Sequence, residues 1–453
     1  MHIGEDIDVD KYVICDYRVT THLPMEKAAN SIAAEQSTGT WTDLTTTTQK
    51  IVDNYGAKVL SIEGDMTRIA YPVDDFSIEV GGIPQILSVI AGNLFGLESI
   101  DKLRLEDVFF PKCIQEMYRG PKFGVDGLRK ILDRPEKPLV GTIVKPKIGL
   151  PPKETAEYVY EAGAGGLTNS KDDETLTDQK FCPIEDRTVA VAEALDRLAS
   201  EGHHMVHAIN ISTNGDKIVE LAEKVQSWGA KQIMVDVITC GFAAVQALAE
   251  DPSIKVPIHV HRTMHGALTR DPLHGISMLP ITKLVRMCGG DALHIGTLGV
   301  GKMSGNAGAD LNNLHACLDS TGGYKTVMPV CSGGVYPGMI GKMVQVSGKT
   351  VQIQAGGGVA GHPGGVRKGA MAMCQAVDAA FMDIPVQEYA KDTWVLGDVC
   401  QQIVVLVVEF HTFHGNGNHL RSRSLDSLGH QRIVVKLACA QKQTRVKLPS
   451  CNY

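Results

Sequence analysis

The chain has 453 residues, a formal net charge of −7 and an apolar fraction of 43%, which fits a globular protein of more than one domain. Acidic and basic residues are mixed along the chain, so no basic patch indicates nucleic-acid binding. The longest aliphatic run, residues 403–408, is too short to span a bilayer. Eleven cysteines without CxxC spacing predict reduced thiols, so we expect a cytoplasmic protein with no nucleic-acid or membrane partner.

Residues 1–130 mix helical and strand patterns and predict a smaller α+β N-terminal domain. The expected elements are strands over 12–18 and 67–71 and helices over 25–34 and 84–94. Pro135 and Pro138 mark the junction with the next domain.

From Pro138 onward, an apolar strand followed by an amphipathic helix is repeated. The predicted strands are residues 139–144, 166–170, 205–211, 232–237, 256–260, 292–295, 326–330 and 351–354. Helices are predicted between them, including 152–162, 188–200, 217–228, 241–249 and 278–287. Eight such units predict a TIM (β/α)8 barrel over residues 131–392 and hence an α/β fold. A doubly wound open sheet is the alternative, although no GxGxxG follows the first strand to favour a dinucleotide fold.

Residues 393–453 follow neither the helical nor the strand period. An aliphatic run is followed by a His/Gly/Asn segment and then by a basic Ser/Arg stretch. We treat this part as an atypical C-terminal tail of unknown structure and a candidate for disorder.

Lys171 to Glu174, after the predicted second strand, place three carboxylates beside a lysine. Two acids suit a hard cation such as Mg²⁺, which prefers oxygen ligands. The lysine would repel the cation unless CO2 converts its amine to a carbamate, which is a third anionic oxygen ligand. Taken alone, such a run is more often a solvated charged turn.

Other polar residues end neighbouring strands, where a TIM barrel carries its chemistry. Lys145 and Lys147 leave a stiff turn around Pro146 and can depress each other's pKa, which would supply a neutral amine for proton transfer. Two ordinary surface lysines are the plain alternative. Asn210 and Asp236 end the third and fourth strands, either as caps or as supports for neighbouring groups.

The fifth strand ends in an imidazole pair. Alternation places His259 and His261 on one face, next to Arg262; imidazole shuttles protons near neutral pH and arginine grips phosphate. A zinc site is the weaker alternative, because no cysteine or third histidine stands at ligand spacing. The glycine-rich segment 296–302, which carries Lys302, resembles either a lid over a substrate or a plain flexible loop.

The last two strands end in glycines, at Ser332-Gly333-Gly334 and Gly356-Gly357-Gly358. Bare backbone N–H groups there can wrap a phosphate, whereas a tight turn would explain either cluster separately. With Arg262 and His294 opposite, the two clusters predict a substrate with two anionic ends and a metal between them. A sugar bisphosphate whose enediol is stabilised by the metal fits this arrangement.

With these motifs in place, the chain resembles ribulose-1,5-bisphosphate carboxylase/oxygenase (RuBisCO) large subunits, and is most similar to the archaeal form III group, over roughly residues 10–392. The matching segments are residues 34–35, 37–41, 92–93, 104–107, 141–147, 171–174, 261–262, 296–302, 332–334, 356–358 and 361–363.

The resemblance implies a role for each matching residue. Lys171 would be the carbamylated lysine and would hold Mg²⁺ together with Asp173 and Glu174. Lys145 would be the catalytic acid/base and His261 a second proton-transfer group. Lys147 would support Lys145, Asn93 would contact substrate and metal, and Lys302 would stabilise the incoming carboxylate and pair with Glu35. One end of the bisphosphate would be held by Arg262, His294 and Ser332. The other phosphate would be held by Thr40, Trp41, Gly334, Gly356 and Gly357, with Gly333 also in contact with substrate.

The resemblance also implies the reaction. Ribulose 1,5-bisphosphate would be enolised, would attack CO2, and after hydration would be cleaved to two 3-phosphoglycerates, with O2 competing for the enediol. Form III relatives suggest AMP or nucleoside salvage. Because the N-terminal domain of one subunit completes its partner's site in this family, a homodimer or a ring of dimers is implied. A RuBisCO-like enolase or isomerase that fixes no CO2 is the alternative, and a non-enzymatic sugar-phosphate binder would have no use for the lysines and the metal cluster.

Four features depart from the family pattern. Thr168 stands where an aspartate is usual and Asn169 where an apolar residue is common, which predicts altered support for the carbamate. Ser304 replaces a common acid after the loop lysine. From Thr393 the sequence is unlike the family, and our hypothesis is a frame-shifted or fused C-terminus that intact mass of the native protein would test.

Overall fold

The structure, a computed structural model, describes residues 7–390 except 41, 43, 135 and 301–305. Within these residues it contains a five-stranded mixed sheet followed by a closed eight-stranded parallel barrel. The predicted α/β fold, a TIM barrel preceded by a smaller α+β domain, is therefore confirmed. Met1–Cys400 form one compact unit, which holds both the sheet and the barrel.

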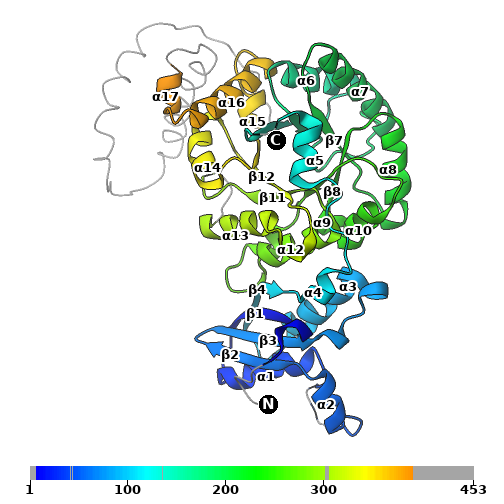
Figure 1. The fold of residues 1–453 in the computed structure, drawn as a ribbon, viewed down its shortest axis with the longest axis vertical. Coiled ribbons are helices and arrows are strands. Elements are labelled where there is room, and N and C mark those ends of the chain that lie inside the picture. Colours follow the sequence, from blue (N-terminus) through cyan, green and yellow to red (C-terminus); the bar gives the residue numbers. More distant parts are fainter. Residues whose placement is uncertain (1–6, 41, 43, 135, 301–305, 391–453) are drawn as a thin grey trace, which may run out of the picture. The chain divides into compact units, whose positions relative to one another are not determined.

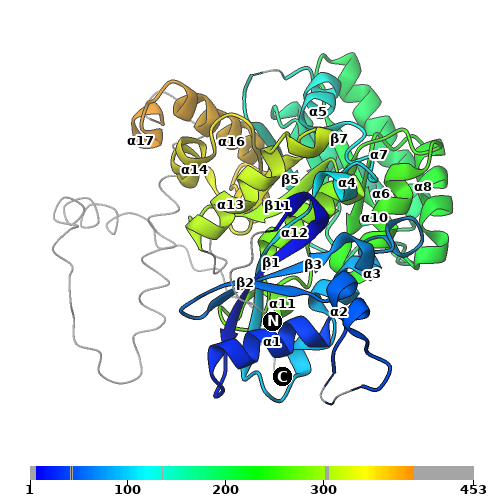
Figure 2. The same ribbon diagram turned by 60° about the horizontal axis from the view of Figure 1, so that its bottom comes forward.

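The N-terminal sheet has the strand order β10-β4-β1-β3-β2. Its strands are β1 (Tyr12–Thr20), β2 (Lys58–Glu63), β3 (Met66–Pro72), β4 (Lys102–Phe109) and the short β10 (Gly275–Ile276). Every second residue of β1 is buried, as expected for a strand with one face on a core. Helix α1 (Met25–Glu35) packs on β2 and β3 through a row of small and aliphatic residues (Figure 2).

Helix α3 (Ile78–Ala91) is broken in its first turn, where Gly82 has a φ of 54° and Pro84 follows. With the 3₁₀ turn Asn93–Gly96 it forms a segment that is long and apolar enough, by length and composition alone, to cross a membrane. Its Ile83, Ile86 and Ile90 are fully buried in the domain, and a core helix of a water-soluble protein has the same composition.

The barrel closes in the order β11-β12-β13-β5-β6-β7-β8-β9. Its strands are β5 (Leu139–Ile143), β6 (Asn169–Lys171), β7 (Val206–Asn210), β8 (Gln232–Asp236), β9 (Ile258–His261), β11 (Ala292–Gly296), β12 (Met328–Ser332) and β13 (Gln352–Gln354). The helices around them in Figure 1 are α6 (Pro152–Ala164), α7 (Ile184–Ser200), α8 (Ile218–Ser227), α10 (Phe242–Glu250), α12 (Met278–Cys288), α13 (Ala307–Leu318), α14 (Ile340–Ser347) and α16 (Val366–Phe381). Shorter helices are α2 (Gln49–Tyr55), α4 (Lys112–Gln115), α9 (Val237–Cys240), α11 (Gly266–Thr269), α15 (Gly357–Ala360) and α17 (Val386–Tyr389).

All eight predicted barrel strands overlap an observed one, but the second was placed too early. The prediction began at residue 166, whereas β6 begins at Asn169. Gly165 is the C-cap of α6 and Gly166 has a φ of 97°, so both belong to the turn between helix and strand. Lys171 is consequently the last residue of the strand, and alternation places its side chain on the same face as that of Asn169.

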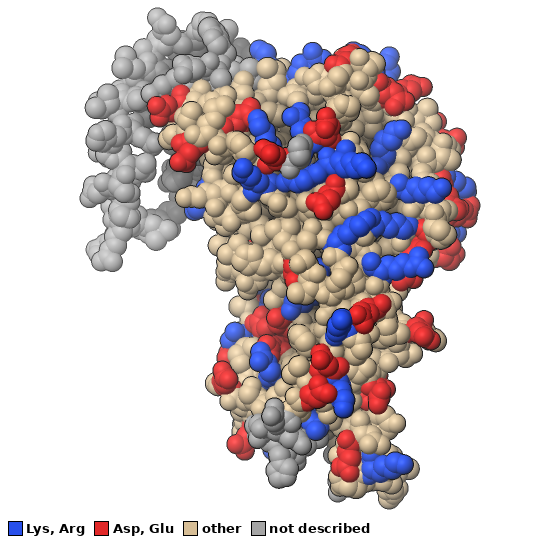
Figure 3. Space-filling view, viewed as in Figure 1, with Lys and Arg blue, Asp and Glu red and all other residues tan. Residues whose placement is uncertain are grey.

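Helix α5 (Gly124–Leu132) closes the N-terminal end of the barrel and lies across the centre of the ring in Figure 1. Its apolar face packs on the first residues of several strands; the cluster is Val125, Leu128, Leu132, Leu139, Val206, Ala292, Met328 and Val330. Figure 3 shows Lys and Arg side chains gathered over this end of the barrel. Because the end is plugged, the opposite end, where the strands finish, is left for the chemistry.

Asp291 joins α5 to the barrel. Its buried carboxylate accepts hydrogen bonds from the backbone N–H groups of Phe123 at 2.7 Å and Gly124 at 2.8 Å, and from that of Ile258 at 2.8 Å. Burial raises the pKa of this carboxyl from 3.8 to about 6, although the three hydrogen bonds favour the charged form.

We expect Asp291 to make the free energy of unfolding fall as the pH rises through about 6. The folded pKa lies above the unfolded value of 3.8, so the contribution of this group is fully present below the unfolded pKa and is lost as the carboxyl ionises. Urea unfolding of the unmodified chain and of Asp291→Asn at several pH values measures it. The difference between the two unfolding free energies should decrease with rising pH, and a difference independent of pH would contradict the expectation.

Candidate active site

Lysines and carboxylates meet at the C-terminal ends of β5 and β6. The ammonium of Lys145 donates to Asp173 Oδ2 at 2.6 Å, and that of Lys147 donates to Glu174 Oε1 at 3.0 Å. Lys147 also lies 3.6 Å from Asp173 Oδ1. The structure therefore brings the predicted lysine pair and the predicted metal ligands into one cluster.

Lys171 is buried within this cluster, with 1% of its surface exposed. Its Nζ donates to the carbonyl oxygen of Asp172 at 3.0 Å and lies 3.7 Å from Glu174 Oε2. Burial lowers the pKa of Lys171, against the opposing effect of the nearby carboxylates of Glu174 and Asp173. A solvated charged turn is thus excluded, and the neutral amine that reacts with CO2 is favoured.

Glu174 stays charged, and so does Lys147. Burial alone would raise the pKa of Glu174. Before Lys171 reacts with CO2, its positive charge outweighs burial and, with the hydrogen bond from Lys147, leaves the value at about 2. The hydrogen bond to Glu174 raises the pKa of Lys147. For Lys147 the expectation that the two lysines depress each other's pKa is therefore wrong, because each lysine faces a carboxylate.

The donor set fits a hard divalent cation. Asp173 and Glu174 supply carboxylate oxygens, and Lys171 would supply a third oxygen ligand once carbamylated. Across residues 7–390, with the gaps given above, no three His, Cys, Asp or Glu side chains form a group that could hold a metal by themselves. That is expected of a site whose third protein ligand is a modified lysine.

A buried network beneath the cluster was not predicted from the sequence. Asp172 accepts hydrogen bonds from Arg187 Nε at 3.1 Å, His207 Nε2 at 3.0 Å and the backbone N–H of Asn210 at 2.9 Å. The side chains of Asp172 and Arg187 are 0% exposed. Although burial opposes ionisation, the charge of Arg187 and the contact with His207 hold the pKa of Asp172 at about 2. Asp172 therefore anchors the turn that carries the two neighbouring carboxylates.

The ends of β7 and β8 support the same turn. Asn210 Nδ2 donates to the carbonyl oxygens of Asp173 at 3.4 Å and Glu174 at 3.2 Å. Asp236 contacts His261 Nδ1 at 3.1 Å, and His261 Nε2 lies 3.8 Å from Glu174 Oε2. Burial and the charge of Lys171 lower the pKa of His261, so its imidazole is neutral at pH 7. Of the roles left open for Asn210 and Asp236, support for neighbouring site groups fits these contacts.

The groups predicted to bind the substrate's ends lie at the next strand ends. Arg262 follows β9 and donates to the carbonyl of Ile295 at 3.1 Å, and His294 Nδ1 lies 2.7 Å from Ser332 Oγ. Gly333 and Gly334 have φ values of 118° and 74°, which glycine adopts without strain. Gly356 is the N-cap of α15, which Gly357 begins, and a Cβ added at Gly356 would stand 2.9 Å from Lys145 Cε.

The predicted site residues of the N-terminal domain lie near one another. Glu35 ends α1 and Asn93 begins a 3₁₀ turn against which α1 packs, and Thr40 follows in the loop after α1. Among the described contacts, no hydrogen bond or ion pair joins these three to the barrel strand ends. Trp41, Lys302 and Ser304 fall outside the described residues, as does the tail with its frame-shift hypothesis.

Thr168 and Asn169, the two departures from the family pattern before Lys171, have different surroundings. The hydroxyl of Thr168 exchanges hydrogen bonds with the backbone of Val140, and its odd spacing from Lys171 places it on the opposite face of the strand. Asn169 lies opposite Gly141 on β5, and a Cβ at Gly141 would stand 2.0 Å from Asn169 Oδ1. The glycine thus makes room for the asparagine.

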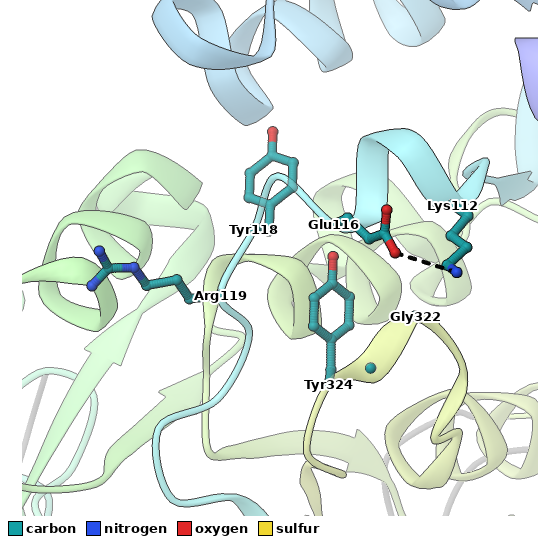
Figure 4. Close-up of a pocket in the computed structure, with 7 residues that line it drawn as sticks. Lys112, Glu116, Tyr118, Arg119, Gly322 and Tyr324 are labelled. Atoms are coloured by element: carbon teal, nitrogen blue, oxygen red, sulfur yellow. Dashed lines mark ion pairs between the residues drawn. The ribbon is translucent and has the colours of Figure 1, made fainter.

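A pocket of about 500 Å³ lies away from these strand ends. Figure 4 shows it between the Lys112–Glu116 ion pair and the side chains of Tyr118 and Tyr324. None of its lining residues belongs to the cluster of lysines and carboxylates. We therefore place the active site by its chemistry and not by this cavity.

A closed parallel barrel with paired lysines, carboxylates and histidines at its strand ends defines a TIM-barrel enzyme. Residues 124–402 match the family described as ribulose bisphosphate carboxylase large chain, catalytic domain, and residues 5–114 match the N-terminal domain of the same family. The chain belongs to the ribulose bisphosphate carboxylase large-chain family.

Its relatives include archaeal proteins. The ribulose bisphosphate carboxylase of Methanocaldococcus jannaschii is 41% identical over 393 residues, which cover 81% of this chain and 91% of that protein. That of Methanosarcina acetivorans is 38% identical over 406 residues, covering 84% and 94%. Among solved structures, octameric RuBisCO from Pyrococcus horikoshii with sulfate has a TM-score of 0.82 at 36% identity, covering 87% of this chain and 94% of that chain. Dimeric RuBisCO from Hyperthermus butylicus has a TM-score of 0.79 at 36% identity, covering 87% and 96%.

Proposed function

We propose that this protein carboxylates ribulose 1,5-bisphosphate with CO2 to give two 3-phosphoglycerates, with O2 as a competing substrate. The observation that carries the proposal is the buried Lys171 beside Asp173 and Glu174, with Lys145 hydrogen-bonded to Asp173. We further propose that it is a cytoplasmic enzyme of AMP or nucleoside salvage, as the resemblance to form III proteins suggests.

In this proposal, metal binding and proton transfer are carried out by different side chains. Mg²⁺, held by carbamylated Lys171, Asp173 and Glu174, would supply Lewis-acid stabilisation of negative charge on the substrate. Lys145 would take a proton from the sugar carbon next to the carbonyl, because its amine stands at the carboxylate cluster. His261, neutral and oriented by Asp236, would serve as a second proton acceptor.

The two phosphates would lie at opposite sides of the mouth. Arg262, His294 and Ser332 would hold one, and the glycine N–H groups after β12 and β13 would hold the other. We further propose a homodimer, or a ring of dimers, in which Glu35 and the loop after α1 serve the partner's barrel. The dimeric and octameric relatives support this assembly.

A carboxylase-like enolase or isomerase is the second candidate, since a rubisco-like protein from Burkholderia fungorum has a TM-score of 0.78 at 26% identity, covering 86% of this chain and 99% of that chain. Such proteins typically lack the loop lysine or phosphate-binding residues, whereas this chain has Lys302, Arg262 and both glycine clusters. Incorporation of labelled CO2 into 3-phosphoglycerate, with ribulose bisphosphate and Mg²⁺, decides between them. Enolisation without incorporation would overturn the carboxylase proposal.

We expect Gly356→Ala to lower the carboxylation rate about tenfold and leave the fold intact. The backbone at Gly356 has a φ of −75°, which alanine adopts. The new Cβ, however, would stand only 2.9 Å from Lys145 Cε and would push the lysine side chain aside. Steady-state kinetics measure the effect. Gly341→Ala is the control, because no atom lies within 4 Å of its added Cβ. Full activity of Gly356→Ala would show that the placement of Lys145 is not critical.

A further inference from the structure

Three side chains on neighbouring barrel strands form a hydrogen-bonded chain that ends at the proposed substrate. His259 Nε2 lies 2.8 Å from His294 Nε2, and His294 Nδ1 lies 2.7 Å from Ser332 Oγ. The rings of His259 and His294 are 4.9 Å apart and nearly perpendicular. Both nitrogens of His294 are therefore engaged, and His259 has no part in the function proposed above.

The free nitrogen of His259 determines which way this chain runs. His259 is 0% exposed, and its Nδ1 has no hydrogen-bond partner in the described structure. A buried N–H without an acceptor is rarer and costlier than an unused lone pair. Burial also lowers the pKa of both His259 and His294, so each ring is neutral and carries one proton. The proton of His259 consequently belongs on Nε2.

The remaining proton positions follow from that assignment. His259 Nε2–H donates to His294 Nε2, which must then be the unprotonated nitrogen. The single proton of His294 lies on Nδ1 and is donated to Ser332 Oγ. The hydroxyl hydrogen of Ser332 is left free to point toward the mouth of the barrel. If the hydrogen bonds ran in the opposite direction, Ser332 would donate its hydroxyl hydrogen to His294 and would present only lone pairs to an anion.

We propose that His259 is a positioning residue that sets the tautomer of His294 and thereby makes Ser332 a hydrogen-bond donor to an anionic oxygen of the substrate. The inference rests on the proposed bisphosphate substrate, because only an anion requires a donor at Ser332. His294, which the proposed function counts among the residues that hold this phosphate, then acts through Ser332, because both of its ring nitrogens are engaged.

The first test needs no substrate. Nitrogen-15 NMR of the full-length protein with labelled histidine reports which ring nitrogen carries the proton, and the His294 signals are assigned by their loss in His294→Gln. We expect the proton on Nδ1 of His294 and on Nε2 of His259. A proton on Nε2 of His294 would overturn the inference whether or not the protein is a carboxylase.

The second test separates donor chemistry from packing. His259→Gln keeps an amide donor, whereas His259→Leu removes it. We expect His259→Leu to raise KM for ribulose bisphosphate about tenfold with kcat within about twofold, since one charge-assisted hydrogen bond is weakened. His259→Gln should restore most of the affinity, and His204→Leu, at an exposed position, should leave KM unchanged.

A double variant tests whether the effect of His259 depends on Ser332. If His259 acts through Ser332, the combination of His259→Leu with Ser332→Ala should raise KM no further than Ser332→Ala alone. Additive effects, or equal effects of His259→Gln and His259→Leu, would contradict the inference. Absence of CO2 incorporation in the unmodified chain would instead refute the proposed function, and it would not affect the tautomers determined by NMR.

Discussion

Lys171→Ala should abolish labelled CO2 incorporation, with a loss of at least about 10³-fold. The substitution removes the buried amine whose pKa is lowered by desolvation, and with it the third oxygen ligand that Asp173 and Glu174 require. The remaining pair of carboxylates would bind a hard cation weakly. Incorporation of labelled CO2 and the affinity for Mg²⁺ in the presence of CO2 are the two measurements.

A matched control keeps the result specific. Lys153→Ala replaces an exposed lysine on α6 and should leave both measurements unchanged. The unmodified chain should also bind Mg²⁺ more tightly as CO2 is added, whereas Lys171→Ala should show no such dependence. Carboxylation by Lys171→Ala at the rate of the unmodified chain would refute the assigned role.

Arg187→Leu should lower the free energy of unfolding by about 3–5 kcal/mol, the range for breaking a buried ion pair from one side. Arg187 and Asp172 are both 0% exposed, so the substitution leaves an uncompensated carboxylate in the barrel wall. Arg187 also donates to the carbonyls of Cys182 and Thr177, which would lose their partner. Urea unfolding, with CO2 and Mg²⁺ absent, measures the loss.

Helix α7 itself provides the control. Arg197, on the same helix, pairs with Glu201 at an exposed position, so Arg197→Leu should leave the free energy of unfolding nearly unchanged. Similar losses for the two variants would show that the helix, and not the buried pair, determines the effect.

The sequence allowed the main features of the fold to be predicted, because its strands are continuous apolar runs that end in unusual residues. The barrel could be counted from these runs, and the motifs at Lys145, Lys171 and His261 follow three of the observed strands or end them. The contacts among those residues then follow from geometry, since parallel strands bring their C-terminal ends to one rim.

Other features could not be predicted from the sequence. Arg187 lies in an amphipathic helix, where an arginine usually faces solvent, so only the fold shows that it is fully buried against Asp172. The second strand was placed too early because Gly166 was taken as its first residue, although this glycine belongs to the turn before the strand. His259 appeared in the sequence only as half of a pair, and its contact with His294 depends on the closure of the barrel.

The close approach of Asn169 to Gly141 has an evolutionary consequence. The two residues face each other across β5 and β6, and a side chain at 141 would collide with the asparagine amide 2.0 Å away. A residue larger than glycine at 141 becomes accessible only after the side chain at 169 has shrunk. Within the family we therefore expect a larger residue at 141 only in chains that carry a smaller one at 169.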